Sequence, residues 1–131
     1  MRFVLDHSLA PRFAEILAIF EGPAGENVDH LRRFFPGHTE DPIWLTELGK
    51  AAPDAIVITS DPRISRGQHE RKAWLESGLT IFFLRSFADL PFNEQAWRIM
   101  KWWPAIVKEA KKARPGSGFL VTVNGRIEAL K

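Results

Sequence analysis

The chain has 131 residues, the usual size of one compact domain, and we expect residues 1–131 to form a single unit. Hydrophobic residues make up 45% and charged residues 26% of the sequence, a composition that fills a core and excludes intrinsic disorder. The absence of cysteine excludes disulfides, thiolate zinc sites and a cysteine nucleophile. The longest apolar run, Ile16 to Phe20, is too short to span a bilayer, so we expect a cytoplasmic protein that binds no membrane.

The net charge is only +2, but the charges are unevenly distributed along the chain. Residues 1–61 contain 5 Lys or Arg and 10 Asp or Glu, whereas residues 98–131 contain 8 and 2. Two interpretations are open. The folded chain can place an acidic site beside a basic rim, which suits joint binding of a metal and a polyanion, or the charges can form an ordinary solvated face.

Three short segments rich in Val, Ile and Phe are predicted to be strands buried on both faces: Arg2 to Leu5, Ala55 to Thr59 and Thr80 to Leu84. Asn27 to Leu31 is a weaker strand candidate because it holds few apolar residues. Buried strands without alternation are typical of parallel sheets, so the three apolar segments are expected to be central strands.

Two amphipathic helices are predicted in the first half of the chain. The first has an apolar stripe from Phe13 to Phe20, with Ser8 as a candidate N-cap and Pro11 in its first turn. The second has a stripe from Trp44 to Ala52 behind the candidate cap Thr39.

Two further helices are predicted in the second half. The third begins at the capping box Ser65 to Gln68 and runs to about Ser77. The fourth runs from about Asn93 to Ala113, with a kink expected at Pro104. Because strand and helix alternate, the sequence predicts an α/β fold in which right-handed crossovers build a mainly parallel sheet covered by helices on both sides, a three-layer α/β/α sandwich.

The last segment has a different pattern. Phe119 to Val123 and Arg126 to Leu130 flank the dipeptide Asn124-Gly125, which is typical of a two-residue type I′ turn. We therefore expect a C-terminal antiparallel hairpin or an added edge strand.

Three acidic residues are expected at one edge of this sheet. Asp6 follows the first strand, Asp61 follows the strand that ends at Thr59, and Asp41 falls in the first turn of the second helix. Ligands of open α/β sheets bind beyond the carboxyl ends of the strands. Crowded carboxylates repel one another unless a hard cation neutralises them, so the sequence predicts a Mg²⁺ or Mn²⁺ site formed by these three residues.

Each acid also has a structural interpretation. Asp61 precedes Pro62 and can begin a turn, Asp41 can complement a helix dipole, and Asp6 can be an ordinary loop residue. The combination, rather than any single residue, favours a site.

The three motifs around these acids resemble the PIN-like nucleases. The segments are Arg2 to Leu9, Asp41 to Leu45 and Ile56 to Ile64, and Gly118 to Leu130 is similar to the ending of the short PIN-like toxins of bacterial toxin–antitoxin pairs. The resemblance implies an α/β/α sandwich that hydrolyses RNA phosphodiesters with Mg²⁺ or Mn²⁺. Asp6 and Asp61 match the acids of the family's first and third motifs, and Asp41 matches its helical acid.

The resemblance also implies partners: an RNA substrate, an antitoxin protein and, as a further expectation, a second copy in a homodimer. Thr59 and Ser60 offer hydroxyl groups beside Asp61, and Arg63 and Arg66 offer cationic groups that can hold phosphates, so these four are predicted to bind substrate. A solvated helix face is the other interpretation of the two arginines.

Two alternatives to a metal-dependent ribonuclease are open. Many relatives have a further acid two positions after the equivalent of Asp61, where this chain has Arg63, and that difference favours a PIN-like fold that has lost catalysis and acts as a binding module. A phosphoacceptor receiver domain has similar length and alternation. It needs paired acids after the first strand and a lysine after the last core strand, but this chain has His7 after Asp6 and Arg85 after Leu84.

Overall fold

A computed structural model describes residues 1–130, which form one six-stranded sheet with helices on both faces. The strands are β1 (Arg2–Leu5), β2 (Asn27–His30), β3 (Ile56–Thr59), β4 (Thr80–Leu84), β5 (Gly118–Val121) and β6 (Ile127–Ala129). The helices are α1 (Pro11–Glu21), the short 3-10 helix η1 (Leu31–Arg33), α2 (Asp41–Ala51), α3 (Arg63–Arg66), α4 (Gln68–Ser77) and α5 (Phe92–Lys112). In the sheet order β2-β1-β3-β4-β5-β6, all neighbours pair parallel except β5 and β6.

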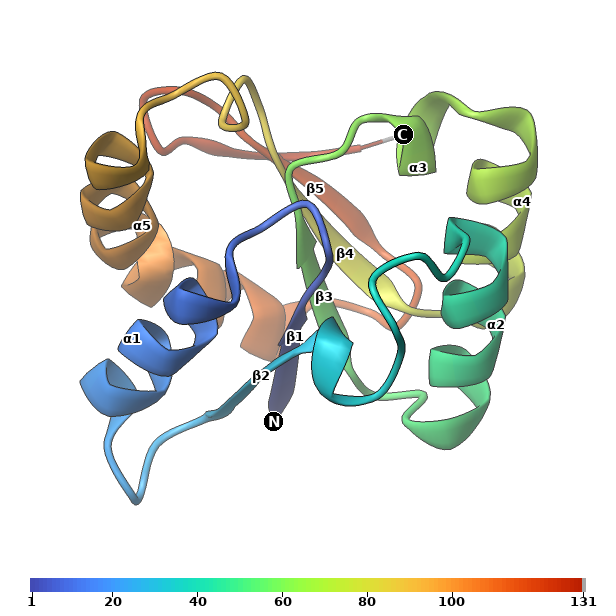
Figure 1. Cartoon of the computed structure of the whole chain (residues 1–131), viewed down its shortest axis with the longest axis horizontal. Helices are drawn as coiled ribbons and strands as arrows, with labels where there is room; N and C mark the ends of the chain where they lie inside the picture. The colour runs from blue at the N-terminus through green and yellow to red at the C-terminus, as the bar shows by residue number, and fades with distance from the viewer. Residues whose placement is uncertain (131) are drawn as a thin grey trace.

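The sheet is the middle of three layers, as predicted. Figure 1 shows α1 and α5 on one face and α2, α3 and α4 on the other. Successive side chains of each central strand enter opposite cores: in β1, Phe3 and Leu5 pack toward α1 and α5, whereas Val4 packs toward α2 and α4. Burial on both faces explains why these strands have no polar alternation.

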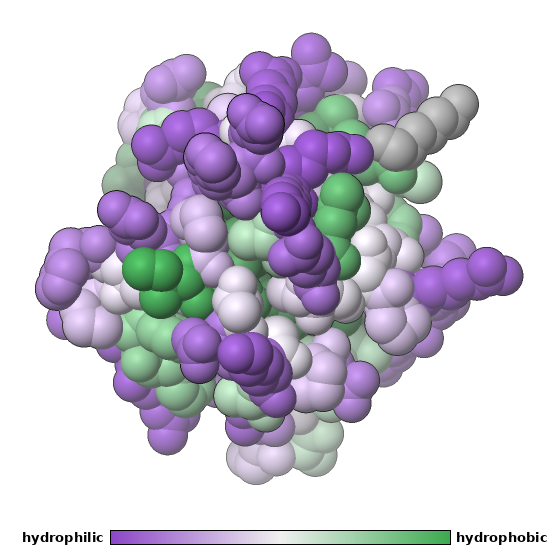
Figure 2. Space-filling view, turned by 90° about the vertical axis from the view of Figure 1, so that its right-hand side faces the viewer, coloured by the Kyte–Doolittle hydropathy of each residue, from purple (hydrophilic) through white to green (hydrophobic). Residues whose placement is uncertain are grey.

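The space-filling view shows the outer face of the α2 and α4 layer. Figure 2 shows that this face is mainly hydrophilic, with small separated apolar patches. Ile43 on α2 and Leu75 on α4 are among the exposed apolar side chains. Within residues 1–130, none of the helices is long and apolar enough to cross a membrane.

Both predicted N-caps of the first two helices are wrong. Helix α1 is preceded by Ala10 and α2 by Glu40, and neither residue caps its helix through a side-chain hydrogen bond. Each helix has a proline in its first turn, whose ring presets φ near the helical value, and each begins without a side-chain cap. The hydroxyl of Ser8 bonds to Asp6 instead.

The predicted capping box is also wrong. Ser65 lies inside the short helix α3, where its hydroxyl donates to the carbonyl oxygen of Pro62 at 3.0 Å. Gly67 adopts an extended conformation that separates α3 from α4 and serves as the N-cap of α4. Helix α4 therefore begins at Gln68, and its end at Ser77 is as predicted.

The C-terminal hairpin is present, but its predicted turn type is wrong. The amide of Thr122 donates to the carbonyl of Arg126, and the amide of Gly125 donates to the carbonyl of Thr122, which leaves three residues in the loop. Gly125 has a φ of 83°, whereas Asn124 has no positive φ, and a type I′ turn requires positive φ at both central residues. Helix α5 continues through Pro104 without interruption.

Candidate functional site

The strand order creates a crevice between β1 and β3. The chain passes from β1 to β2 on one side and later returns to β3 on the other side of β1. Ligands of open α/β sheets bind where the strand order reverses, beyond the carboxyl ends of the strands. Asp6 directly follows β1, and Asp61 follows β3 after one intervening residue, so both lie at this reversal.

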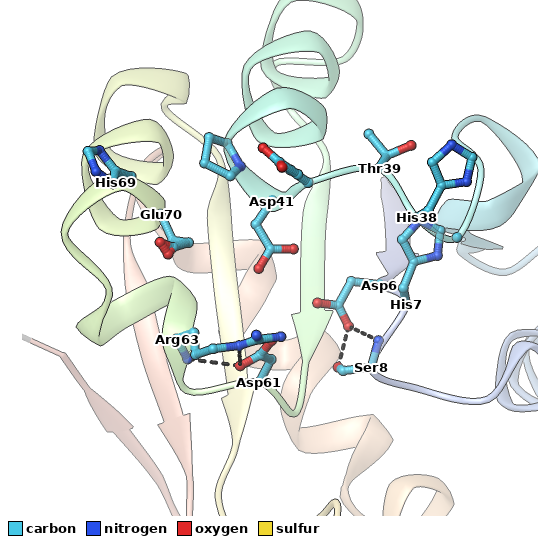
Figure 3. Close-up of a pocket in the computed structure, with 13 residues that line it drawn as sticks. Asp6, His7, Ser8, His38, Thr39, Asp41, Asp61, Arg63, His69 and Glu70 are labelled. Carbon is cyan, nitrogen blue, oxygen red and sulfur yellow. Dashed lines mark hydrogen bonds and ion pairs between the residues drawn. The ribbon is translucent and has the colours of Figure 1, made fainter.

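A pocket of about 650 Å³ occupies this position. It is lined by all three acids that the sequence predicted, Asp6, Asp41 and Asp61, together with Glu70 and Arg63. Figure 3 shows the carboxylates of Asp6, Asp41 and Glu70 directed toward the same space, with the Asp61 and Arg63 pair at its edge. The fold therefore brings together carboxylates that lie far apart in the sequence.

Asp6 is the most buried of the acids, with 3% of its surface exposed. Its Oδ1 accepts hydrogen bonds from the amide of Ser8 at 3.0 Å and from the Ser8 hydroxyl. Its Oδ2 accepts from the hydroxyl of Thr59 at 2.6 Å. Burial raises the pKa of Asp6 to about 6, because the loss of water disfavours the charged form more than the hydrogen bonds from Ser8 and Thr59 favour it.

Thr59 and Ser60 belong to the same hydrogen-bond network. The Thr59 hydroxyl accepts from the amide of Asp61 at 3.0 Å, and the Ser60 amide donates to the Ser8 hydroxyl at 2.9 Å. Both side chains are buried, so in this arrangement they hold the ends of β1 and β3 together and orient Asp6. The role in substrate binding that the sequence suggested for them stays a prediction.

Asp41 lies at the start of α2, where its Oδ1 accepts a hydrogen bond of 2.9 Å from the indole Nε1 of Trp44. Trp44 is fully buried, so this bond ties the carboxylate to the core. The pKa of Asp41 is raised, first by burial and then by the negative charge of Asp61, against the effect of the Trp44 bond. The charge of Asp41 in turn contributes to the raised pKa of Asp6.

Asp61 is bound by Arg63, two residues further along the chain. The Arg63 Nε lies 3.0 Å from Oδ2 and 3.1 Å from Oδ1, its Nη2 lies 2.7 Å from Oδ2, and its backbone amide donates to Oδ1 at 2.9 Å. Burial alone would raise the pKa of Asp61, but the hydrogen bonds and charge of Arg63 outweigh burial and lower it. A guanidinium group thus neutralises one carboxylate of the pocket.

The sequence analysis missed Glu70 as a member of this pocket. Glu70 is the third residue of α4, and it lines the pocket because α4 begins at Gln68. The other acids of the following segments do not reach this pocket: Asp89 lines a different one, and Glu94 accepts a hydrogen bond from Trp97 on α5. The signal that could have identified Glu70 is Gly67, because an N-cap there places an acid in the first helical turn.

His7 lies beside Asp6 and lines the same pocket. Its pKa is lowered, mainly by burial and then by the charge of His30, whose ring centroid is 5.9 Å away. The Nε2 atom of His7 is buried and has no hydrogen-bond partner among residues 1–130.

The chain was compared with protein families, with curated proteins and with solved structures. The family described as PIN like domain matches residues 1–86, which include Asp6, Asp41 and Asp61. This chain belongs to the PIN-like domain family. No curated protein and no solved structure matches it. PIN-like domains are generally nucleases. Its family therefore places this chain in a nuclease-type superfamily.

The donor set of the PIN-like pocket suits a hard divalent cation, but it does not form a closed cage. Among residues 1–130, no group of three or more His, Asp or Glu side chains is arranged to hold one ion. Asp61 faces Arg63, and both oxygens of Asp6 face hydroxyl groups. Mg²⁺ is commonly held by one or two carboxylates with water and substrate phosphates as the other ligands, and carboxylates of this pocket fit that pattern.

We predict that Asp6→Asn stabilises this PIN-like domain in a pH-dependent way. The pKa of Asp6 is about 6 in the folded chain, against an ordinary value of 3.8 that applies to the unfolded chain. Between these pH values the folded chain binds more protons at Asp6 than the unfolded chain does. The stability of the fold therefore falls as pH rises through this range. The variant carries no such penalty. We compare the free energy of unfolding of the variant with that of the original chain at each pH. The advantage of the variant should be larger at pH 7 than at pH 4, by up to about 3 kcal/mol.

Urea denaturation in chelator at pH 4, 5.5 and 7 measures this difference. Asp54→Asn removes the same charge from an exposed turn and serves as the control. A loss of stability in Asp6→Asn that is equal at all three pH values would contradict the prediction.

Proposed function

We propose that this PIN-like domain is a metal-dependent ribonuclease. The observation that carries the proposal is the meeting of Asp6, Asp41 and Asp61, from three separate sequence motifs, in one pocket at the reversal of the strand order. Such a site combines oxygen ligands for Mg²⁺ or Mn²⁺ with a pocket of about 650 Å³. When bound, the cation supplies a Lewis acid that polarises the phosphate and lowers the pKa of water.

In this proposal the residues of the chain have distinct tasks. Asp6 and Asp61 are the ligands, and Asp41 supports them from the start of α2. Ser8 and Thr59 hold the Asp6 carboxylate in one orientation through hydrogen bonds to its two oxygens. A carboxylate fixed in this way does not have to reorganise when the substrate binds.

The proposed reaction is hydrolysis by water. The oxygen of water attacks phosphorus, the bond between phosphorus and the 3′ oxygen breaks, and the leaving 3′ oxygen receives a proton. Water thus adds a hydroxyl group to phosphorus and a hydrogen to the leaving group. Because the ribose 2′-hydroxyl takes no part, the products end in a 3′-hydroxyl and a 5′-phosphate.

The first test is cleavage of a labelled single-stranded RNA with Mg²⁺ or Mn²⁺. Asp6→Asn and Asp61→Asn should each lower turnover by about 100-fold or more, because each removes a carboxylate ligand of the cation that would polarise the phosphate. His7→Ala should have a much smaller effect, since a water nucleophile bound in this way does not require a histidine base. Asp6→Asn is the most informative variant, because it is expected to fold and a loss of turnover would then not come from unfolding.

Turnover that persists in excess chelator, or that is unchanged in Asp6→Asn, contradicts the metal mechanism. A complete absence of cleavage in the original chain under all conditions favours the second candidate, a PIN-like binding module. The observation that favours the binding module is the ion pair of Arg63 with Asp61, which places a cationic group where a metal ligand is expected.

The ion pair of Arg63 with Asp61 leads to a separate prediction about the affinity of the pocket for the cation. The guanidinium group must leave Asp61 before a cation can use that carboxylate, and it then becomes available to a phosphate of the substrate, as the sequence predicted. The pair is largely solvent-exposed on the Arg63 side, so its contribution is about 0–1 kcal/mol. Arg63→Gln should therefore bind Mn²⁺ more tightly, by up to about 5-fold.

Calorimetric titration of Mn²⁺ in the absence of RNA measures this affinity. Arg66→Gln is the matched control, because Arg66 lies in the same short helix and forms no ion pair with Asp61. Unchanged or weaker binding in Arg63→Gln would show that the pair does not compete with the cation.

The proposed biological role is the toxin of a toxin–antitoxin pair, as the resemblance to short PIN-like toxins implies. The Asp61 and Arg63 pair supports a way to inhibit such a toxin, since it demonstrates that a carboxylate of the pocket accepts a guanidinium group. An arginine inserted by an antitoxin would bind the acids in place of the cation. Co-expression with the product of the neighbouring gene should give a stable, inactive complex, and separate elution of the two proteins would count against the toxin role.

A further inference from the structure

A second pocket adjoins the acidic pocket on the far side of Asp61. Its volume is about 700 Å³, and it lies beyond the carboxyl ends of β3 and β4. Asp61 lines both pockets, so the two are separated only by this residue and its neighbours. A chain molecule that has one group at Asp61 can extend into this second pocket.

The second pocket is suited to phosphate by its charges. Arg66 from α3 and Arg85 from the end of β4 line it, and both side chains are exposed. Neither forms an ion pair with an acid of residues 1–130, in contrast to Arg63. The acidic pocket is lined by five acids and one arginine, Arg63. The second pocket is lined by two arginines and two acids, Asp61 and Asp89, and Asp61 is already paired with Arg63. The second pocket is therefore less acidic, and a polyanion gains more by extending toward Arg66 and Arg85.

Part of the wall of the second pocket is apolar. Phe83, Leu84 and Phe87 form its buried base, and the partly exposed Leu120 and Leu130 line it as well. An apolar wall beside cationic groups matches a nucleotide, whose base and ribose are largely apolar on their faces and whose phosphate is charged.

A route on the opposite side of the acidic pocket is less favourable. A pocket of about 450 Å³ shares His7 and Gly37 with the acidic pocket, and Arg32 is its one arginine. Within residues 1–130, the lining of this route contains no acid, but the route offers a smaller volume and one guanidinium group instead of two. Arg32 therefore provides a matched control, because it is an arginine next to the same acidic pocket on the wrong side.

We propose that the second pocket is a subsite for single-stranded nucleic acid, in which Arg66 and Arg85 bind the phosphates of nucleotides that flank the scissile bond. The inference rests on the proposed ribonuclease function, and it specifies the side of Asp61 along which the strand lies. The sequence suggested a phosphate contact for Arg66. The fold adds Arg85, which is 19 residues away in the chain and lines the same pocket.

Binding of a fluorescein-labelled octauridylate in chelator, followed by anisotropy at several salt concentrations, tests the subsite. Each phosphate contact on a single strand contributes about 0.7 to the slope of log K against log salt. Arg66→Gln and Arg85→Gln should each reduce the slope by about 0.7 and weaken binding several-fold, whereas Arg32→Gln should leave the slope unchanged. Glutamine keeps a polar side chain and removes the positive charge in all three variants, and circular dichroism should show that each variant is folded.

Cleavage assays with Mn²⁺ separate this inference from the proposed function. The two variants should raise KM for the octamer several-fold more than KM for a dinucleotide, because a dinucleotide lacks the additional phosphates that the subsite would bind. If the original chain cleaves RNA but Arg66→Gln and Arg85→Gln behave like it, or if Arg32→Gln alone weakens binding, the subsite is wrong and the ribonuclease proposal stands. If the original chain neither binds nor cleaves RNA, both proposals fail.

Discussion

The hydrogen-bond network around Asp6 joins the two strands on which the pocket is built. The Asp6 amide donates to the carbonyl of Ile58, and the Asp6 carboxylate accepts from Ser8 and Thr59, so the ends of β1 and β3 are fixed to each other through backbone and side chains. A carboxylate this deeply buried is costly when charged, and its raised pKa expresses that cost. The network thus maintains an unfavourable charge at the point where the strand order reverses, which is where a ligand can neutralise it.

Charge compensation then divides the pocket into two parts. Asp6 and Asp41 both have raised pKa values, largely because they are buried, whereas Arg63 lowers the pKa of Asp61. The chain supplies its own cation to one side of the pocket and leaves the other side acidic. This asymmetry is the basis on which a nuclease and a binding module can be told apart, because the Arg63 guanidinium either yields to a metal or remains in place.

The layers that surround the pocket were largely predictable from the sequence, but several local features were not. The strands β1 and β4 have the predicted bounds because continuous apolar runs are buried on both faces. The helix starts differ because proline replaced side-chain capping in α1 and α2, and because Gly67 interrupted a segment whose Ser65 and Gln68 matched a capping box. The same error hid Glu70, since its contact with the pocket depends on where α4 begins.

The sequence by itself determined the alternation of strands and helices and the positions of Asp6 and Asp61 after their strands, because local apolar runs and strand ends are encoded by neighbouring residues. Only the tertiary structure decided that β1 lies between β2 and β3, that Glu70 joins the three predicted acids, and that Arg63 binds Asp61. The first two features join residues from different elements, and the spacing along the chain does not specify their distances in space. Arg63 is only two residues from Asp61, but the sequence does not specify which partner its side chain takes. Partner choice among charged side chains depends on burial and orientation, which arise only when the layers pack.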